Sequence, residues 1–596
     1  MLKRLKSVSM LLFLMGASTG AAYAVANPGV TDVKITQQTG TCTGIVKDAT
    51  GEGVIGASVV VKGTTNGTIT GLDGDFSLSN VKEGDIIVIS FVGYATQEIK
   101  WTGKPLDVLL KDDTQLLGEV VVTALGMKRE EKALGYAVTE LKSEELYTNT
   151  VNPVASLQGK VAGVEISNSD GGIFGSAKIQ IRGASTLGSN NQPIYVVDGV
   201  ILDNSTQGRD MDGEEIDAID YGNELKNLNP DDFETVSVLK GAAATALYGS
   251  RGLNGAVVIT TKGGGKFKGF GVDVTQTLGI DHAYKQPSIQ TVYGPGARPG
   301  RIGYGENGNT WIPTYYTNAK GEPSLIGAST LGWGLPYDSS VMIEDYDGRK
   351  VPYSPIKNNM LDMYQLGFNT NTNVSVRGGN EKTSFYSSVS YKKVNATTPN
   401  NTFERYAFLV KGSHKISDRV DVAASVSFAN SKPRNAARAV GEYFYQGLTP
   451  LYDAKYYRDK YLSEQGGIAR SGDTYANVPE SSKSYWFNID NMDYNRKETV
   501  VRPILEVNVK IADWVRFKGE GNMNYVYIRE ENKELGTGVA YEGGNYKLAQ
   551  QTKEQTTFAG TFTFDKAVKD FNLGGFIRGE YYNNYQTAYS VETDGL

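Results

Sequence analysis

The stretch from Val515 to Tyr527, VRFKGEGNMNYVY, alternates between two kinds of residue. Apolar and aromatic residues, interrupted by two glycines, occupy its odd positions, and charged or polar residues occupy the even positions from Arg516 to Asn524. The same alternation runs through PILEVNVKI (503–511) and VDVAASVSF (420–428). Because successive side chains of a β-strand point to opposite faces of the sheet, these stretches predict strands with one apolar face and one distinctly polar face.

The length and spacing of these strands favour a membrane barrel over a soluble sandwich, which also alternates. The strands run for about ten residues or more, and aromatic residues lie near their ends, at Tyr525, Tyr527, Tyr581 and Tyr582. Short turns (GGNEK, ISDR, IADW and VKD) alternate with long polar excursions at 282–360 and 432–497. Short turns at one end and long loops at the other are typical of transmembrane β-barrels, and a bilayer requires such a sheet to close.

About nine such strands occur between Gly271 and Glu592, within a predicted barrel segment of residues 269–596. A barrel of that size is filled by its own side chains, so it could not hold the unit at residues 133–262. We therefore expect either that this unit lies outside the barrel or, as we favour, that the chain is the N-terminal part of a longer protein. The predicted fold class is mainly β, with a small sandwich, an α+β unit and the first strands of a large barrel.

The N-terminus has the form of a secretory signal peptide. Lys3, Arg4 and Lys6 precede an apolar run, and Ala22-Tyr23-Ala24 follows it, which predicts a leader of residues 1–24 cleaved after Ala24. The apolar run is too short to span a bilayer, and no later stretch approaches the roughly 18 uninterrupted apolar residues of a transmembrane helix. The sequence therefore predicts an exported protein without a helical anchor.

Composition argues against several classes of function. Cys42 is the one cysteine, which excludes disulfide frameworks and cysteine metal sites, and we expect it to be an ordinary strand residue. His282 and His414 are the only histidines, too few for a histidine-based hydrolase or zinc enzyme. A net charge of −6 disfavours nucleic acid as a partner. We predict no enzymatic activity, no cofactor and no metal, whereas 70 glycines and 36 tyrosines suit an outer-membrane barrel.

Residues 41–112 predict a small β-sandwich, because turn signals such as Asp73-Gly74 separate runs of β-branched residues. The stretches TGLDGDFSL and ISFVGYATQEI resemble the carboxypeptidase-regulatory-like domain, a name that implies no peptidase activity here. A linker follows at 113–132. The unit at 133–262, in which NPVASLQGKVAGVEIS looks like a short helix running into a strand, is glycine-rich and α+β.

Three long motifs in this unit resemble the plug domain of the SusC/RagA-type TonB-dependent outer-membrane transporters: LQGKVAGVEI, IQIRGASTLGSNNQPIYVVDGV and VSVLKGAAATALYGSRGLNGAVVITTKGG. We call residues 133–262 the plug. The sandwich and the alternating strands follow the order of that family, so the resemblance covers essentially the whole mature chain. One departure is Gly241, where the family more often has an acidic residue, and we attach no functional loss to it.

The resemblance implies a plug inside a barrel of about 22 strands in the outer membrane. It also implies import of a large nutrient, an oligosaccharide or in some members a peptide, energised by the inner-membrane protein TonB. A SusD-like surface lipoprotein would close the mouth as a lid. An alternative function is a receptor that reports ligand binding inward through the sandwich. An enzymatic function rests only on the family name of the sandwich and lacks catalytic residues.

The charged residues and glycines of the plug motifs can also be interpreted from their chemistry, without the resemblance. Arg182 precedes Gly183, where its guanidinium could pair with a carboxylate, and Asp198, followed by Gly199 in a tight-turn signal, is the nearest candidate. Such a pair could be a transport switch or could simply stabilise the fold. The glycines around Arg251 (Gly249, Gly252 and Gly255) permit tight backbone turns before a buried strand.

The linker segment GEVVVTAL lies where the family keeps its TonB box. Two interpretations are open: it is the last strand of the sandwich, or it is a free strand that pairs with an edge of TonB. Because PLDVLLKDD already supplies a closing strand, we favour TonB binding, with a polar KREEK tail that keeps the segment loose. The predicted TonB-binding residues are Glu119, Val120, Val121, Val122, Thr123 and Ala124.

The long excursions contain many aromatic residues. Aromatic faces suit contact with sugars, peptides or a lid protein, and they equally suit packing within the loops. The residues that we consider for ligand or lid contact are Trp311, Tyr315, Trp333, Tyr443, Tyr445 and Trp486.

Overall fold

The computed structural model describes residues 40–593, except 49–50, 65, 92–93, 95, 111–119, 123–127, 131–137, 143–144, 147–150, 169–171, 184–190, 203–219, 242–243, 245–247, 265–268, 297–314, 327, 329–330, 333, 436–447 and 569–570. The chain divides into two compact units, Met1–Glu119 and Val120–Leu596. Each unit has hydrophobic cores of its own.

The first unit contains a small β-sandwich. One sheet has the order β4-β1-β7, with β1 (Gly40–Lys47), β4 (Asp75–Val81) and β7 (Leu106–Leu109). The other has the order β3-β2-β5-β6, with β2 (Ser58–Val61), β3 (Gly67–Ile69), β5 (Ile86–Ser90) and β6 (Gln97–Lys100). Alternate residues of these strands form one core, which includes Cys42, Val59, Phe76 and Ile89. The predicted sandwich is confirmed, and Cys42 is a buried strand residue.

A short hairpin begins the second unit. Strand β8 (Val120–Val122) pairs antiparallel with β9 (Lys128–Glu130), so that Val121 lies opposite Arg129. Within the described part of the chain this two-stranded sheet includes no strand of the sandwich. The start of the KREEK tail is therefore a strand partner of the valine run and not a loose extension.

The plug is built on a five-stranded sheet with the order β10-β15-β16-β13-β14. Its strands are β10 (Val138–Lys142), β13 (Ile194–Val197), β14 (Val200–Leu202), β15 (Phe233–Leu239) and β16 (Ala256–Thr261). A second sheet pairs β11 (Val164–Asn168) with β12 (Ala177–Ile181). The predicted short helix before β11 is the 3-10 helix η5 (Pro153–Leu157), whose Leu157 packs in the plug core beside Ile166.

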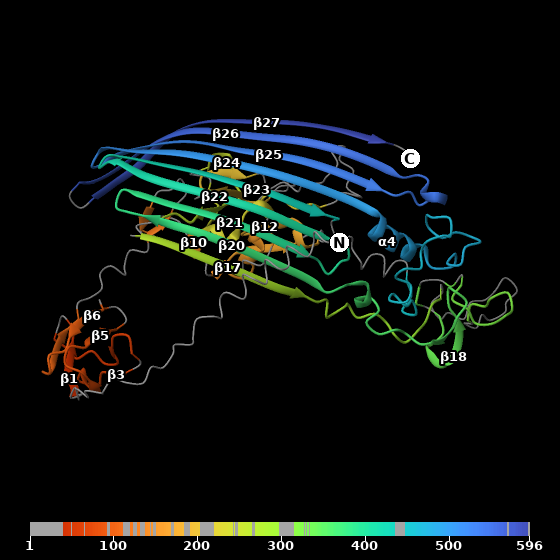
Figure 1. Ribbon diagram of the computed structural model, residues 1–596, viewed down its shortest axis with the longest axis horizontal. Helices are drawn as coiled ribbons and strands as arrows, with labels where there is room; N and C mark the ends of the chain where they lie inside the picture. Colours follow the sequence, from red (N-terminus) through yellow and green to blue (C-terminus); the bar gives the residue numbers. More distant parts are fainter. Residues whose placement is uncertain are drawn as a thin grey trace, which may run out of the picture. The chain divides into compact units, whose positions relative to one another are not determined.

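A single antiparallel sheet of nine strands forms the largest part of the second unit, and we call it the wall (Figure 1). Each strand pairs with the next along the chain: β17 (Gly269–Asp281), β20 (Gly367–Gly379), β21 (Thr383–Asn395), β22 (Thr402–Ser417), β23 (Val420–Arg434), β24 (Met492–Ala512), β25 (Val515–Glu534), β26 (Asn545–Val568) and β27 (Phe571–Thr593). Two to three residues connect the strands at one end, and residues 282–366 and 435–491 form long connections at the other. None of the helices in the described ranges is both long and apolar enough to cross a membrane.

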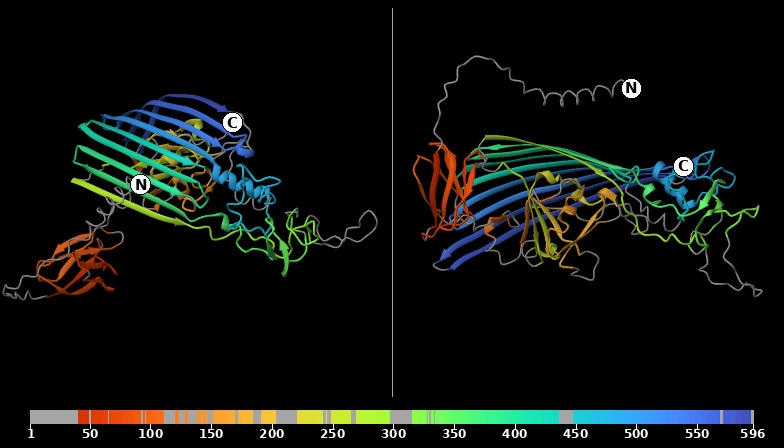
Figure 2. Two further views of the ribbon diagram at one scale, coloured as in Figure 1. Left: turned by 45° about the vertical axis from the view of Figure 1, so that its right-hand side comes forward. Right: turned by 90° about the horizontal axis from the view of Figure 1, so that it is seen from below.

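The plug packs against one face of the wall, which we call the inner face (Figure 2). The alternation in the sequence assigns the faces correctly: Asn522 and Asn524 on β25 are buried on the inner face, whereas Leu505 on β24 is 53% exposed. The prediction that aromatic residues lie near the strand ends is wrong: Tyr525 and Tyr527 are near the middle of β25, and Tyr581 and Tyr582 are at the middle of β27. Tyr582 also departs from a girdle in the face that it takes. Its ring lies on the inner face below Arg251 of the plug, because neighbouring residues of β27 alternate and Tyr581 takes the outer face.

The long connections fold together on a core of their own. This core joins the hairpin β18 (Asp338–Glu344) and β19 (Lys350–Tyr353), the 3-10 helices η10 (Leu361–Met363) and η11 (Val539–Tyr541), and helix α4 (Glu480–Asn491). Buried aromatic residues dominate it, among them Tyr353, Tyr452, Tyr457 and Phe487. The described parts of the polar excursions thus form a packed loop layer at the long-connection end of the wall.

Candidate functional site

A polar turn of the plug, residues 223–233 (NELKNLNPDDF), is buried against the wall, and we call it the plug anchor. Asn223 caps the 3-10 helix η7 (Glu224–Asn227) by accepting a hydrogen bond from the Leu225 N–H, and η8 (Pro230–Asp232) follows. The four charged side chains of the anchor are at most 7% exposed (Glu224, Lys226, Asp231 and Asp232). Charges are buried in this way only when they have partners.

Lys226 and Glu498 form the centre of these contacts. Lys226 Nζ lies 2.7 Å from Glu498 Oε1, and both side chains are at most 1% exposed. The same carboxylate accepts hydrogen bonds from Arg496 Nε at 2.6 Å and from Asn227 Nδ2 at 2.9 Å. Arg496 also reaches Glu530 on β25 at 3.1 Å. The buried charges of plug and wall therefore neutralise one another.

A second contact holds the beginning of the anchor. Glu224 Oε2 lies 3.3 Å from Arg502 Nη2 and accepts a hydrogen bond from Asn524 Nδ2 at 3.0 Å. Arg502 Nε in turn donates to Asn524 Oδ1 at 2.9 Å. Both wall residues lie on inner-face positions of β24 and β25, so the alternation of the strands directs them at the plug.

The end of the anchor uses neutral donors and one arginine. Arg405, fully buried on β22, donates to the backbone carbonyls of Lys226 (3.1 Å) and Leu228. The side chains of Asn371 and Tyr386 donate to Asp231 and Asp232 at 2.6 and 2.9 Å. Hydrogen-bond donors from three neighbouring strands thus satisfy the carboxylates and carbonyls of the turn.

Burial shifts the titration of two anchor groups. It lowers the pKa of Lys226, against the opposing effect of Glu498. It raises the pKa of Asp232, although hydrogen bonds from Ser388, Asn229 and Tyr386 favour the charged form. Both shifts have the sign that loss of water imposes on a charged group.

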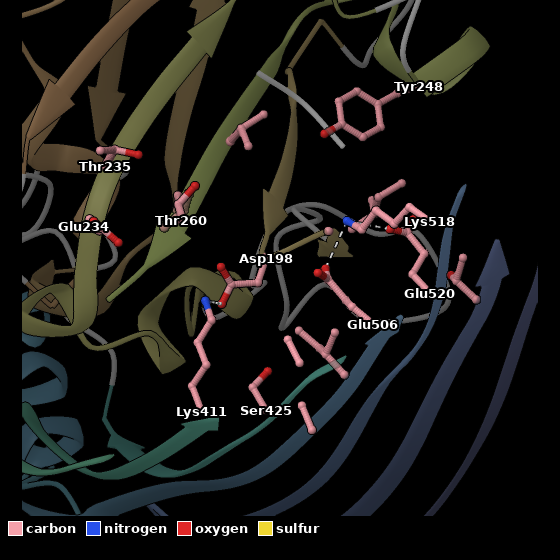
Figure 3. Close-up of a pocket in the computed structure, with 18 of the residues that line it drawn as sticks. Asp198, Glu234, Thr235, Tyr248, Thr260, Lys411, Ser425, Glu506, Lys518 and Glu520 are labelled. Atoms are coloured by element: carbon pink, nitrogen blue, oxygen red, sulfur yellow. Dashed lines mark hydrogen bonds and ion pairs between the residues drawn. The ribbon is translucent and has the colours of Figure 1, made fainter. Parts of the chain in front are cut away.

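A cavity of about 610 Å³ separates another part of the plug from the wall. It lies toward the short-turn end, because its lining includes Ser425 and Glu520, each five residues from the start of its strand. Charged side chains line it from both sides: Glu140, Asp198 and Glu234 from the plug, and Lys411, Glu506, Lys518, Glu520, Arg578 and Glu580 from the wall. Figure 3 shows Lys518 between Glu506 and Glu520.

At this cavity Asp198 pairs with Lys411 of the wall, and its partner is therefore not the predicted Arg182. Its carboxylate lies 3.3 Å from Lys411 Nζ (Figure 3). It also accepts hydrogen bonds from the backbone N–H and the hydroxyl of Thr261. Arg182 is exposed, and the predicted pair with Asp198 does not form among the residues that the structure describes. The Asp198-Gly199 turn itself is present, with φ of 46° and 88°, as a two-residue hairpin between β13 and β14.

The glycine-rich motif positions Arg251 at the wall. Arg251 lies in the 3-10 helix η9 (Gly249–Gly252), and its Nη2 is 2.5 Å from Glu580 Oε1 on β27. Gly255 follows with φ of 97°, and a Cβ at that position would lie 2.8 Å from Ile181 Cδ1. A residue with a side chain would therefore disturb the start of β16.

The segment predicted to bind TonB is only partly described. Val120, Val121 and Val122 form β8, and Glu119, Thr123 and Ala124 lie outside the described residues. In the two-stranded sheet β9 occupies one edge of β8. The extended backbone that pairing with a partner strand requires is therefore present.

The aromatic residues considered for ligand contact divide between packing and the undescribed ranges. Trp486 on α4 is 1% exposed and belongs to the loop core. Tyr315 is partly buried and packs edge-on against Tyr353 with ring centroids 5.0 Å apart. Loop packing thus accounts for both residues. Trp311, Trp333, Tyr443 and Tyr445 lie outside the described residues.

Sequence reasoning did not identify the plug anchor. Its three asparagines, two aspartates and one proline have the composition of a surface turn. The only signal was the matching supply of charged residues, such as Arg496, Glu498 and Arg502, on the polar face of a later strand. Neither half reveals the burial without the other.

Comparison with family models identifies the two N-terminal parts. Residues 42–122 match the CarboxypepD_reg-like domain, and residues 130–256 match the TonB-dependent Receptor Plug Domain. The first match ends at the last residue of β8. Together with the wall, these matches define the fold class: an N-terminal β domain, a plug domain and part of a barrel, arranged as in TonB-dependent receptors.

Similar proteins define the type more narrowly. The chain is 35% identical over 400 residues to the TonB-dependent receptor SusC of Bacteroides thetaiotaomicron. This match covers 66% of the chain and 34% of SusC. The chain is also 27% identical over 463 residues to the TonB-dependent receptor P26 of Formosa agariphila, covering 76% and 39%. The chain is therefore a homologue of the SusC/RagA-type receptors and spans only about a third of the length of these relatives.

The fold has a counterpart among solved structures. The open-open state of the RagAB peptide importer matches with a TM-score of 0.59 at 19% identity, over 80% of this chain and 50% of that one. The nine-stranded wall thus has the fold of part of a barrel, as predicted. The relatives are receptors and transporters rather than enzymes, in agreement with the prediction from composition.

Proposed function

We propose that this chain is the N-terminal portion of an outer-membrane importer, which takes a large nutrient, an oligosaccharide or a peptide, across the membrane at the expense of force from TonB. The leader at residues 1–24 would direct export, and further strands would complete the barrel. Unpaired strand edges are not tolerated in lipid, which supports a continued sheet on both β17 and β27.

The plug anchor is the observation that carries this proposal. A plug bound to the wall through buried ion pairs blocks passage, and such pairs resist disruption: removing one partner of a buried pair costs about 3–5 kcal/mol. Thermal motion alone would rarely displace such a plug. An external force applied along the chain would supply the missing energy.

The route of that force begins at β8. A partner strand can add to an edge of an extended segment through main-chain hydrogen bonds, and Val120–Val122 already has that conformation. The force would then pass along the chain to β10, the edge strand of the plug sheet, whose Glu140 faces the cavity. The cavity offers space into which the plug can move. A SusD-like lipoprotein would close the mouth above the loop core.

Substitution of Val121 by proline tests the route. Proline removes a backbone donor from β8, so we expect uptake to fall to the level of a strain without TonB, while surface amount and ligand binding are retained. Val121→Thr is the matched control, because threonine keeps the donor and the strand preference. Deletion of residues 118–125 should have the same effect as the proline. Uptake at the normal rate in the deletion variant would contradict the proposal.

A second candidate function is supported by the independence of the first unit. The sandwich has a complete core and lies in a compact unit separate from the plug and wall. In this alternative the protein is a receptor that reports ligand binding through the sandwich. Removing residues 41–112 would then silence induction of downstream genes while growth on the ligand continues.

A further inference from the structure

Five charged side chains of the wall form one continuous chain of ion pairs along the cavity. Glu506 Oε1 lies 3.1 Å from Lys518 Nζ, which lies 3.0 Å from Glu520 Oε2. Glu520 Oε1 lies 2.6 Å from Arg578 Nη2, which lies 3.0 Å from Glu580 Oε2. Acidic and basic groups therefore alternate across β24, β25 and β27.

The register of the strands explains how this chain crosses β26. Glu520, Ala559 and Glu580 lie opposite one another on three neighbouring strands. Because Ala559 carries only a methyl group, Arg578 can extend over β26 to Glu520. Thr561, the β26 partner of Arg578, accepts a further hydrogen bond from the guanidinium at 3.1 Å. Small residues on β26 are thus what makes the chain continuous.

The last member of the chain belongs to the plug. Arg251 Nη2 lies 2.5 Å from Glu580 Oε1, whereas Arg578 contacts the other carboxylate oxygen, Oε2. The guanidinium carbon of Arg251 lies 4.9 Å from the centre of the Tyr582 ring. The two paired side chains are 36% and 23% exposed, in contrast to the anchor pairs, which are at most 4% exposed. This contact is accessible to water and ions, and it can break without leaving a buried charge.

Arg251 also completes the charge balance. The wall part of the chain holds three carboxylates and two cations, a net charge of −1, and Arg251 brings the sum to zero. We propose that Arg251 is a positioning residue that seats the plug against β27, because its withdrawal leaves one carboxylate of the wall uncompensated and so favours return. Its consequence for import rests on the proposed function, since only a displaced plug needs to be seated again.

Electrical recording from the full reading frame, purified and placed in planar bilayers, tests the seat without TonB or cargo. At low salt we expect Arg251→Gln to raise the fraction of time that the barrel conducts roughly fivefold, the size of one exposed ion pair with a cation–π contact. In about 1 M salt, where the Debye length is about 3 Å, the difference should disappear. Arg251→Lys keeps the charge and should lie between the two.

Lys178→Gln is the matched control, because it removes one exposed cation from β12 of the same domain and should leave conduction unchanged. In the double variant Arg251→Gln with Glu580→Gln, the increase in conduction should be smaller than the sum of the increases in the two single variants. Wild-type conduction in Arg251→Gln at low salt, an effect that persists in high salt, or full additivity would overturn the inference. Loss of TonB dependence in the uptake assay would contradict the proposed function and leave this result untouched.

Discussion

Glu498 links plug and wall through three donors from two domains. Lys226 and Asn227 reach it from the plug anchor, and Arg496 reaches it along its own strand. All of these groups are nearly or fully buried. Two carboxylates, Glu498 and Glu530, therefore balance the two cations Lys226 and Arg496 in this buried cluster.

Replacement of Glu498 by glutamine should lower the free energy of unfolding by about 3 kcal/mol, because it leaves Lys226 as an unpaired buried charge. Chemical unfolding of the purified protein in detergent would measure the change. Lys497→Gln is the control, since Lys497 is the exposed neighbour on the opposite face of β24 and its loss should change stability by less than about 0.5 kcal/mol. Equal effects of the two substitutions would contradict the role of Glu498.

Local features at single residues could be predicted, and partners distant in sequence could not. The Asp198-Gly199 turn depends on two adjacent residues that accept positive φ, so the sequence contains it. The predicted partner Arg182 is wrong because the carboxylate meets Lys411, which lies 213 residues further along. Trp486 packs in the loop core for the same reason: its neighbours come from both long connections.

Strands with a solvent or lipid face were the most predictable elements. Period-two alternation fixes both the existence of β23, β24 and β25 and the face that each residue takes. The hairpin of β8 with β9 was not predicted, because Lys128–Glu130 has no β-branched residue and its strand conformation depends on the pairing. The anchor was missed because a turn of this composition is normally solvated.

Strand β10 should be the first element of the plug sheet to leave under force, because among the described strands it is the edge strand that follows the β8 segment in the chain, and it pairs with β15 alone. A disulfide between cysteines at Glu140 and Ser237, which face each other across these strands, would hold it in place. Directly paired residues lie about 4.5–5.5 Å apart, within the range that a disulfide spans. We expect uptake to stop under oxidising conditions and to recover with reductant.

The control for this crosslink is a second cysteine pair in the same domain, at Glu165 and Gln180 of β11 and β12, which should leave uptake unchanged if that sheet stays in place. Native Cys42 is buried in the sandwich core and should not interfere. Normal uptake with a fully formed Glu140–Ser237 crosslink would show that β10 need not move.

At the scale of the whole molecule, the division into two compact units separates two possible roles. The sandwich has its own core, so removal of residues 41–112 should leave the plug and wall folded. We expect uptake within about twofold of the full chain in that variant, because no plug or wall core residue is lost. Growth on the ligand and a transcriptional reporter, measured in parallel, would separate import from signalling. A loss of uptake would instead assign the sandwich to the import machinery.

The plug anchor also dictates an order of assembly. Glu224 binds Asn524, 300 residues further along the chain, and Asn227 binds Glu498 at a separation of 271 residues. When the anchor emerges during synthesis, its counter-charges have not yet been made. Its charges must stay hydrated until β24 and β25 are in place, because burial without partners is strongly unfavourable. The plug is therefore synthesised before the wall but reaches its final structure after the wall has formed.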